Sequence, residues 1–237
     1  MDNDIIQQII KMLTDMHLNV NDAEVKEFVV KAERLHWSAD KIVYEFASML
    51  LQRYRIRSLK NRITRAHFAQ MLYLDTIDHT KLSKDAEEKL SELKTLDFIE
   101  DGKNVIFAGV TGTQKTHMAI GLGIKACQQG YRVLYTTIPN LILQLRETKT
   151  DDAVQKFTRR LNRFHLLICD EYGYLDYDNE GKDLLYTLLT NRIQVGRAAI
   201  FCMLSDESWE TMNGKVAAAA VLYRKICEGA IHVDCNK

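Results

Sequence analysis

The chain has 237 residues, enough for one medium-sized domain and a smaller one, and its 46% apolar and 27% charged residues are typical of a globular protein. Its 32 basic and 32 acidic residues cancel, so total charge neither favours nor excludes a nucleic-acid partner. The first residues are not basic and no apolar run reaches about 18 residues, so we expect a cytoplasmic protein without signal peptide or membrane contact. Five scattered cysteines indicate buried thiols rather than a disulfide framework.

Residues 1–66 are predicted to form a small all-helical N-terminal domain. Apolar residues recur at helical spacing over residues 5–16, which predicts a first amphipathic helix. A second helix is expected to begin at Asn21 or Asp22, and Ser38 can cap a third. Residues 67–103 are of mixed character, and we expect them to connect this domain to the rest of the chain.

The third predicted helix carries a run of positive charge. No acidic residue lies between Glu45 and Asp75, whereas six basic residues do. Such a run along one helix is typical of contact with a phosphate backbone, so we predict that it contacts DNA. A solvated helix face, or a surface that docks on an acidic partner domain, explains the same pattern and stays open. The six candidate DNA-binding residues are Arg53, Arg55, Arg57, Lys60, Arg62 and Arg65.

The stretch most informative about function is a glycine-spaced turn. It lies between a predicted strand, 105–108, and a predicted helix that ends near Gly130. Strand, glycine turn, Lys-Thr and helix is the layout of a phosphate-binding loop, where backbone N–H groups at a helix N-terminus hold an anion. Lys115 is expected to reach the β- and γ-phosphates and the Thr116 hydroxyl to complete a Mg²⁺ shell. The candidate nucleotide-binding residues are Gly109, Val110, Thr111, Gly112, Thr113, Gln114, Lys115 and Thr116.

One position departs from the phosphate-loop pattern, which has a glycine directly before the lysine. Here that residue is Gln114. Glycine suits the position because a phosphate packs against the backbone and leaves little room for a Cβ atom. We expect the glutamine side chain to point at or near the phosphate. The motif therefore predicts the fold and leaves the strength of nucleotide binding open.

Helices and apolar strands alternate over residues 104–237, which predicts a parallel sheet with helices on both faces. Four apolar residues before Asp170 and Glu171 form a Walker B pattern, in which Asp170 would hold Mg²⁺ and Glu171 would polarise the attacking water. A buried strand that merely ends in acids is the alternative. A later strand, 198–204, ends in apolar residues, Met203 among them, where a water-orienting polar residue is expected. The other predicted strands are 131–136, 166–171 and 231–234, and the later predicted helices include 181–195 and 217–226.

These motifs resemble those of the IstB-type helper ATPases of IS21-family transposons, relatives of the DnaC helicase loaders in the AAA+ superfamily. The resemblance covers essentially the whole chain. It implies an α/β P-loop NTPase of the AAA+ class, a three-layer sandwich with a parallel sheet over 104–237, preceded by the helical domain. The matching segments are DGKNVIFAGVTGTQKTHMAIGLGIKA, GYRVLYTT, LILQLR, LLICDEYGYLDYDNEGKDLLYTLLTNR, SDESWE, AAAAVLYRKICEGAIHVD and the basic linker RSLKNRITRAHF.

The resemblance also implies a function. Family members bind ATP, assemble as homo-oligomers on duplex DNA and deliver target DNA to a partner transposase, with ATP hydrolysis as the switch. ATP and Mg²⁺ are the implied cofactors. Carried over by position, Gly109, Gly112, Lys115 and Thr116 would bind the triphosphate, Thr116 and Asp170 the metal, and Glu171 the water. Arg224 matches the arginine of an Asp-Arg pair, a candidate arginine finger that would reach the γ-phosphate of a neighbouring subunit.

Three departures from the family's pattern bear on hydrolysis. Gln114 replaces the loop glycine, Met203 stands where the family has a sensor asparagine, and Tyr223 replaces the aspartate before Arg224. Losing one transition-state contact slows a reaction by roughly 10²-fold or more. Two alternatives therefore stay open: a catalytically impaired homologue that binds DNA and a partner, and a DnaC-like loader whose partner is a replicative helicase.

Overall fold

The structure, a computed structural model, describes residues 3–18, 20–148, 150–173, 178–204 and 217–237. Its contacts divide the chain into two compact units, Met1–Asn61 and Arg62–Lys237. The division falls inside one long helix, α3 (Ala39–Ala66). None of the helices in these ranges is long and apolar enough to cross a membrane.

The first unit is helical, as the sequence predicts. It contains α1 (Asn3–Asp15), α2 (Asp22–Arg34) and the first part of α3. At the start of α2, the Asn21 side chain accepts a hydrogen bond from the N–H of Glu24, whose carboxylate accepts one from the N–H of Asn21. This reciprocal cap satisfies two donors that a helix start leaves open. The buried core consists of Ile6, Leu13, Leu18, Val20 and Val25.

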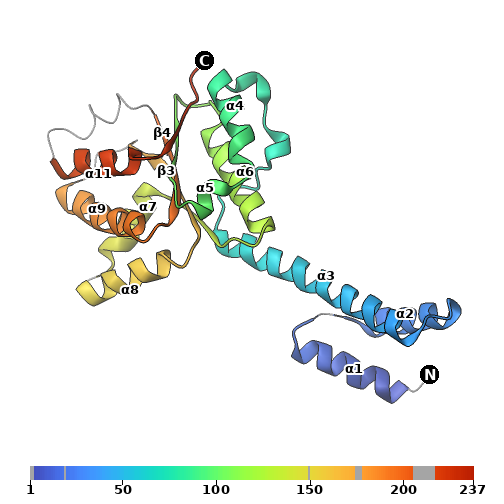
Figure 1. The fold of residues 1–237 in the computed structure, drawn as a ribbon. Helices are drawn as coiled ribbons and strands as arrows, with labels where there is room; N and C mark the ends of the chain where they lie inside the picture. Colours follow the sequence, from blue (N-terminus) through green and yellow to red (C-terminus); the bar gives the residue numbers. More distant parts are fainter. Residues whose placement is uncertain (1–2, 19, 149, 174–177, 205–216) are drawn as a thin grey trace. The chain divides into compact units, whose positions relative to one another are not determined.

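The second unit is built on a five-stranded parallel sheet in the order β2-β3-β4-β1-β5, which confirms the predicted sheet. Helices cover both faces: α4, α5 and α6 lie on one side, and α7, α9 and α11 on the other (Figure 1). The strands are β1 (Val105–Ala108), β2 (Val133–Thr137), β3 (Leu166–Tyr172), β4 (Ala198–Met203) and β5 (Ile231–Asp234). The helices are α4 (Lys84–Leu93), α5 (Asp97–Glu100), α6 (Lys115–Gln128), α7 (Ile138–Arg146), α8 (Asp151–Leu161), α9 (Asn179–Gln194) and α11 (Ala217–Cys227), with short 3₁₀ turns η1 (Leu74–Thr76) and η2 (His79–Lys81).

Parallel pairing places the carboxyl ends of four strands at one edge of the sheet. Met203, the last residue of β4, pairs with Ala108 of β1 and with Tyr172 of β3. On the other side of β3, Asp170 pairs with Thr137 of β2. In open parallel sheets, ligands bind beside these carboxyl ends. The candidate site residues that follow β1 and end β3 are thus neighbours in space.

The predicted connector packs closely against the edge of this sheet. The Ser83 hydroxyl donates to the carbonyl of Asp234, and Lys89 Nζ donates to the carbonyl of His232 at 2.5 Å. Asp85 accepts a hydrogen bond from the N–H of Asp234 at 2.8 Å. These bonds join α4 to β5, so residues 67–103 form part of the second compact unit.

Arg192 on α9 is an unusual buried cation, with only 2% of its surface exposed. Its guanidinium donates to the carbonyl oxygens of Leu161 at 3.1 Å, Phe164 at 3.2 Å and Ala198 at 2.7 Å. Burial lowers the pKa of Arg192 to about 10, so the side chain stays charged at neutral pH. It therefore ties the end of α8 and the turn before β3 to the first residue of β4.

We expect Arg192→Met to lower the free energy of unfolding by about 3 kcal/mol, because it leaves buried carbonyl oxygens without a donor. For a chain of this size that corresponds to a fall in Tm of roughly 6–12 °C in a thermal melt. Arg163→Met, the same change at an exposed arginine, is the control and should leave Tm nearly unchanged. Equal melting of both variants would contradict the structural role of Arg192.

Candidate nucleotide site

The turn between β1 and α6 needs its two glycines for different reasons. Gly112 has a φ of +92°, a left-handed conformation that glycine adopts without steric cost. Gly109 is crowded, because a Cβ atom there would lie 2.9 Å from the Cβ atom of Cys235. The next residue, Asn236, accepts a hydrogen bond from the N–H of Val110 at 2.9 Å. The residues after β5 therefore brace the start of the loop.

Four consecutive backbone N–H groups of this turn have no acceptor within the described part of the chain. No hydrogen bond there uses the N–H of Thr111, Gly112, Thr113 or Gln114 as a donor. These groups directly precede α6, whose first turn carries partial positive charge. Free donors at a helix N-terminus bind anions such as phosphate. The turn is therefore chemically suited to hold the phosphates of a nucleotide.

Lys115 lies at the start of α6 with its ammonium group folded into the loop. The residue is 5% exposed, and Nζ donates to the carbonyl oxygens of Gly109 at 2.5 Å and Val110 at 2.7 Å. Burial lowers the pKa of Lys115, while two buried thiols and Asp170 oppose that shift. A buried ammonium whose closest partners are neutral carbonyls would gain much from an anion beside it.

Gln114 does not point at the loop, so that expectation from the sequence was wrong. Its side-chain amide makes two hydrogen bonds to the backbone of Asp78: Oε1 accepts from the N–H at 3.1 Å, and Nε2 donates to the carbonyl at 2.5 Å. The backbone of Gln114 still has the left-handed φ of +62° that favours glycine. The side chain therefore leaves the turn clear and anchors it to the segment before η2.

Asp170, near the end of β3, collects three hydrogen bonds. The hydroxyls of Thr116 and Tyr135 both donate to Oδ2 at 2.9 Å, and the N–H of Glu171 donates to Oδ1 at 2.9 Å. Thr116 and Asp170 thus meet as the phosphate-loop motif predicts, and hydroxyl and carboxylate oxygens are ligands that Mg²⁺ prefers. Tyr135 was not identified from the sequence. Its place in β2, which pairs with β3, was the available signal.

Tyr135 remains a hydrogen-bond donor under all ordinary conditions. Burial is the largest cause that raises the pKa of its hydroxyl, and the Asp170 carboxylate adds to the shift. The hydroxyl therefore stays protonated and fixes one carboxylate oxygen of Asp170. This bond orients the candidate metal ligand before any metal arrives.

Glu171 occupies an irregular position in β3. Its φ is +58°, and the register of β3 with β4 shifts between Cys169 and Tyr172. The flanking residues Asp170 and Tyr172 are buried, whereas Glu171 is exposed. A non-glycine residue in this conformation costs of order 1–3 kcal/mol and often marks a functional position. The bulge directs the Glu171 side chain toward solvent at the edge where the strands end.

Two other candidates lie apart from this cluster. Met203 is 1% exposed and packs in the apolar core, so it supplies no polar group at the end of β4. Arg224 is exposed on α11, and its guanidinium makes no hydrogen bond or ion pair with any residue that the structure describes. The SDESWE segment lies outside the described residues.

The six predicted DNA-binding residues differ in their surroundings. Arg53 forms an ion pair with Glu24 of α2, so the lack of acidic residues within the run does not leave this charge uncompensated. Arg57 donates to the carbonyl of His17 within the first unit, and Arg62 Nε donates to the carbonyl of Cys127 at 2.8 Å within the second. DNA contact stays a prediction for the whole set. The exposed members are Arg55, Arg57, Lys60 and Arg65.

Comparison with known proteins agrees with this geometry. The family model described as IstB-like ATP binding protein matches residues 12–236. The chain belongs to this family. The ATP-binding protein of insertion sequence IS21 from Pseudomonas aeruginosa is 32% identical, over 76% of this chain and 70% of its own length. That of IS5376 from Geobacillus stearothermophilus is 31% identical, over 71% of this chain and 67% of its own length.

Solved structures show that this IstB-like protein has the fold of AAA+ P-loop proteins. The DnaC helicase loader superposes with a TM-score of 0.54 and 20% identity, over 68% of this chain and 95% of its own. DnaI gives a TM-score of 0.57 at 16% identity, over 69% and 90%. DnaA from Aquifex aeolicus gives 0.58 at 19% identity, over 71% of this chain and about half of its own, 51%.

A Gln114 series tests whether the amide acts as an anchor. We expect Gln114→Gly to bind ATP within about threefold of the natural chain, because the glutamine already points out of the turn. Gln114→Ala keeps the strained φ but loses both hydrogen bonds, so we expect it to be less stable by about 1–2 kcal/mol. The stability of Gln114→Gly should lie between that of the natural chain and that of Gln114→Ala, because glycine loses the same hydrogen bonds but relieves the backbone strain.

Calorimetric ATP titration and thermal melts of the three proteins give these values. If Gln114→Gly binds ATP far more tightly than the natural chain, the glutamine obstructs the turn and the observed orientation does not persist in solution.

Proposed function

We propose that this IstB-like protein is an ATP-dependent helper of DNA transposition. It binds ATP with Mg²⁺, assembles as an oligomer on duplex DNA and delivers target DNA to a partner transposase. The observation that carries the proposal is the geometry around the turn, where free N–H groups, the Lys115 ammonium and the Thr116–Asp170 pair converge. The insertion-sequence names of its relatives support the biological setting.

Each residue at the turn has a defined task in this proposal. Bound ATP with Mg²⁺ supplies the phosphoanhydride bond and the charge that the loop recognises. Lys115 exchanges its two carbonyl partners for phosphate oxygens, a stronger charge-assisted interaction. Thr116 and Asp170 would hold the metal, and Tyr135 keeps the Asp170 carboxylate oriented. Gln114 holds the turn against residue 78, which reduces the ordering that nucleotide binding requires.

The hydrolytic part of the site is less complete than the binding part. Glu171 is the candidate general base, since its exposed carboxylate follows the metal-binding aspartate. Met203 is buried and apolar, so β4 provides no side chain to orient water. Arg224 would act across a subunit boundary, which makes hydrolysis depend on assembly. These features favour slow turnover, so nucleotide binding itself would be the main switch for DNA assembly.

We expect Lys115→Ala to weaken ATP binding by at least about tenfold, because the turn loses its only ammonium group. Lys125→Ala, on the same helix, is the matched control and should bind like the natural chain. Glu171→Gln should keep ATP binding within about threefold while phosphate release falls by roughly 10²-fold.

Fluorescence anisotropy with labelled duplex DNA, with and without ATP, then tests the switch. The natural chain and Glu171→Gln should bind duplex more tightly with ATP, and Lys115→Ala should not respond. Duplex affinity that is independent of ATP in the natural chain would contradict the switch. Phosphate release by Glu171→Gln at the natural rate would contradict the role of Glu171.

A further inference from the structure

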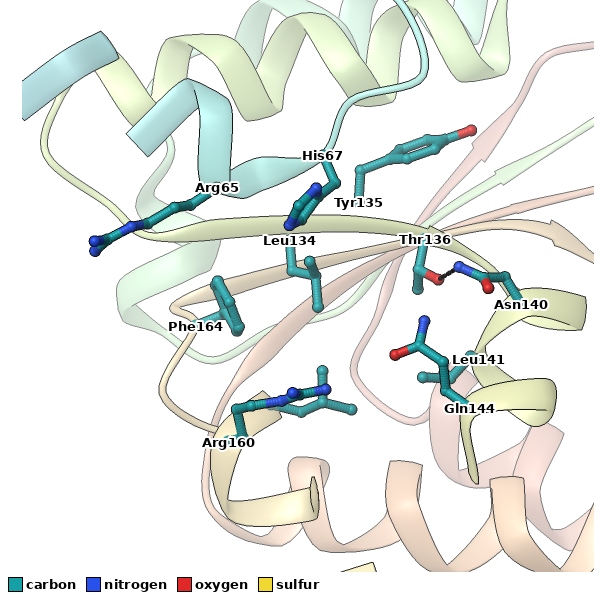
Figure 2. Close-up of a pocket in the computed structure, with 11 residues that line it drawn as sticks. Arg65, His67, Leu134, Tyr135, Thr136, Asn140, Leu141, Gln144, Arg160 and Phe164 are labelled. Atoms are coloured by element: carbon teal, nitrogen blue, oxygen red, sulfur yellow. Dashed lines mark hydrogen bonds between the residues drawn. The ribbon is translucent and has the colours of Figure 1, made fainter. Parts of the chain in front are cut away.

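A pocket of about 480 Å³ lies beside β2; Tyr135 is part of its lining, but none of residues 109–116 is. Its volume falls in the range of roughly 300–1,000 Å³ that small-molecule sites occupy. Figure 2 shows Arg65 and His67 on one side of the β2 ribbon, and Arg160 and Phe164 on the other. The pocket therefore has cationic side chains on both sides of β2 and the aromatic ring of Phe164 on the Arg160 side.

The pocket joins two basic segments that are distant in the sequence. Arg65 ends the basic run of α3, and Arg160 belongs to the basic helix α8, where its guanidinium lies 5.1 Å from the centre of the Phe157 ring. None of the residues that line the pocket is acidic. The opening thus favours anions. Because Arg65 and Arg160 are set apart, they suit a ligand with successive phosphates better than a ligand with a single carboxylate.

The backbone turns an additional ring into this opening. α3 ends at Ala66, and His67 takes a φ of +54°, the left-handed conformation that commonly ends a helix. Figure 2 shows the His67 ring on one side of β2, and the Leu134 side chain and Phe164 on the other; all three line the pocket. Aromatic rings beside cations are the usual means by which proteins hold unpaired bases.

Two amides of α7 provide hydrogen-bonding groups at the far side of the pocket. Asn140 Nδ2 donates to the Thr136 hydroxyl at 3.3 Å, which leaves its carbonyl oxygen available. The half-buried Gln144 amide, one turn later, makes no hydrogen bond to any part of the chain that the structure describes. Such groups can pair with the edge of a base, which presents both donors and acceptors.

We propose that this pocket binds one unpaired nucleotide of a DNA strand. The base lies against Phe164 and His67, its edge meets Asn140 and Gln144, and the flanking phosphates contact Arg65 and Arg160. A base inside a duplex is stacked and paired and cannot enter, so the pocket selects distorted or single-stranded DNA. The inference rests on the proposed DNA-binding function and adds a preference that duplex contacts alone would not give.

The test measures fluorescence anisotropy of the full chain with a labelled thymidine strand of about 20 nucleotides, and with an abasic strand of equal length. The natural chain should bind the abasic strand about tenfold more weakly, because base stacking is lost. Phe164→Leu, which keeps the apolar volume, and Arg160→Gln should each weaken binding of the thymidine strand. Only Phe164→Leu should abolish the difference in affinity between the thymidine and abasic strands. Arg159→Gln, one residue along the same helix but outside the pocket lining, is the matched charge control and should change thymidine binding less than Arg160→Gln.

Each outcome separates this inference from the proposed function. Equal affinity for the thymidine and abasic strands, with ATP-dependent duplex binding intact, overturns the nucleotide pocket alone. Competition by poly-glutamate as strong as that by the thymidine strand would show recognition of charge only and would also overturn it. Failure to bind duplex and single strands alike overturns the proposed function itself. Thermal melts confirm that every variant is folded.

Discussion

The hydrogen bond between the Thr116 hydroxyl and the Asp170 carboxylate, 2.9 Å long, depends on the order and register of the strands in the second unit. Thr116 follows β1 and Asp170 lies near the end of β3, and these strands are not neighbours, because β4 lies between them. Parallel pairing through β4 fixes the relative heights of the two strand ends. Buried, continuous apolar strands hold that register, since a slip would leave ladder groups unpaired. The candidate site is thus a consequence of sheet order.

Much of this arrangement could be predicted because it rests on local patterns. Apolar strands, helix caps such as Asn21, and the glycines of the turn each show their physical role within a few residues of sequence. The side-chain direction of Gln114 could not be predicted, because its partner Asp78 lies 36 residues earlier in the chain. Tyr135 was missed for the same reason: its importance comes from Asp170, a partner on a neighbouring strand.

The basic run of α3 shows a related difference between sequence and structure. Read along the chain, its charges lack acidic neighbours, yet Arg53 finds one on α2. Arg65, at the other end of the run, instead shares a pocket with Arg160 of α8. Charge patterns along one helix therefore do not decide which cations are available to a ligand. Tertiary packing pairs some cations of this run with groups of the protein and leaves others exposed on the surface.

The central claim is that the turn before α6 is already shaped for a nucleotide, with Gln114 acting from outside. An experimental structure of the chain with a non-hydrolysable ATP analogue and Mg²⁺ tests this most directly. We predict that Lys115 Nζ leaves the carbonyls of Gly109 and Val110 for phosphate oxygens, while Gln114 stays bonded to Asp78. A Gln114 amide displaced from Asp78, or a Lys115 that keeps its carbonyl partners beside bound nucleotide, would contradict it.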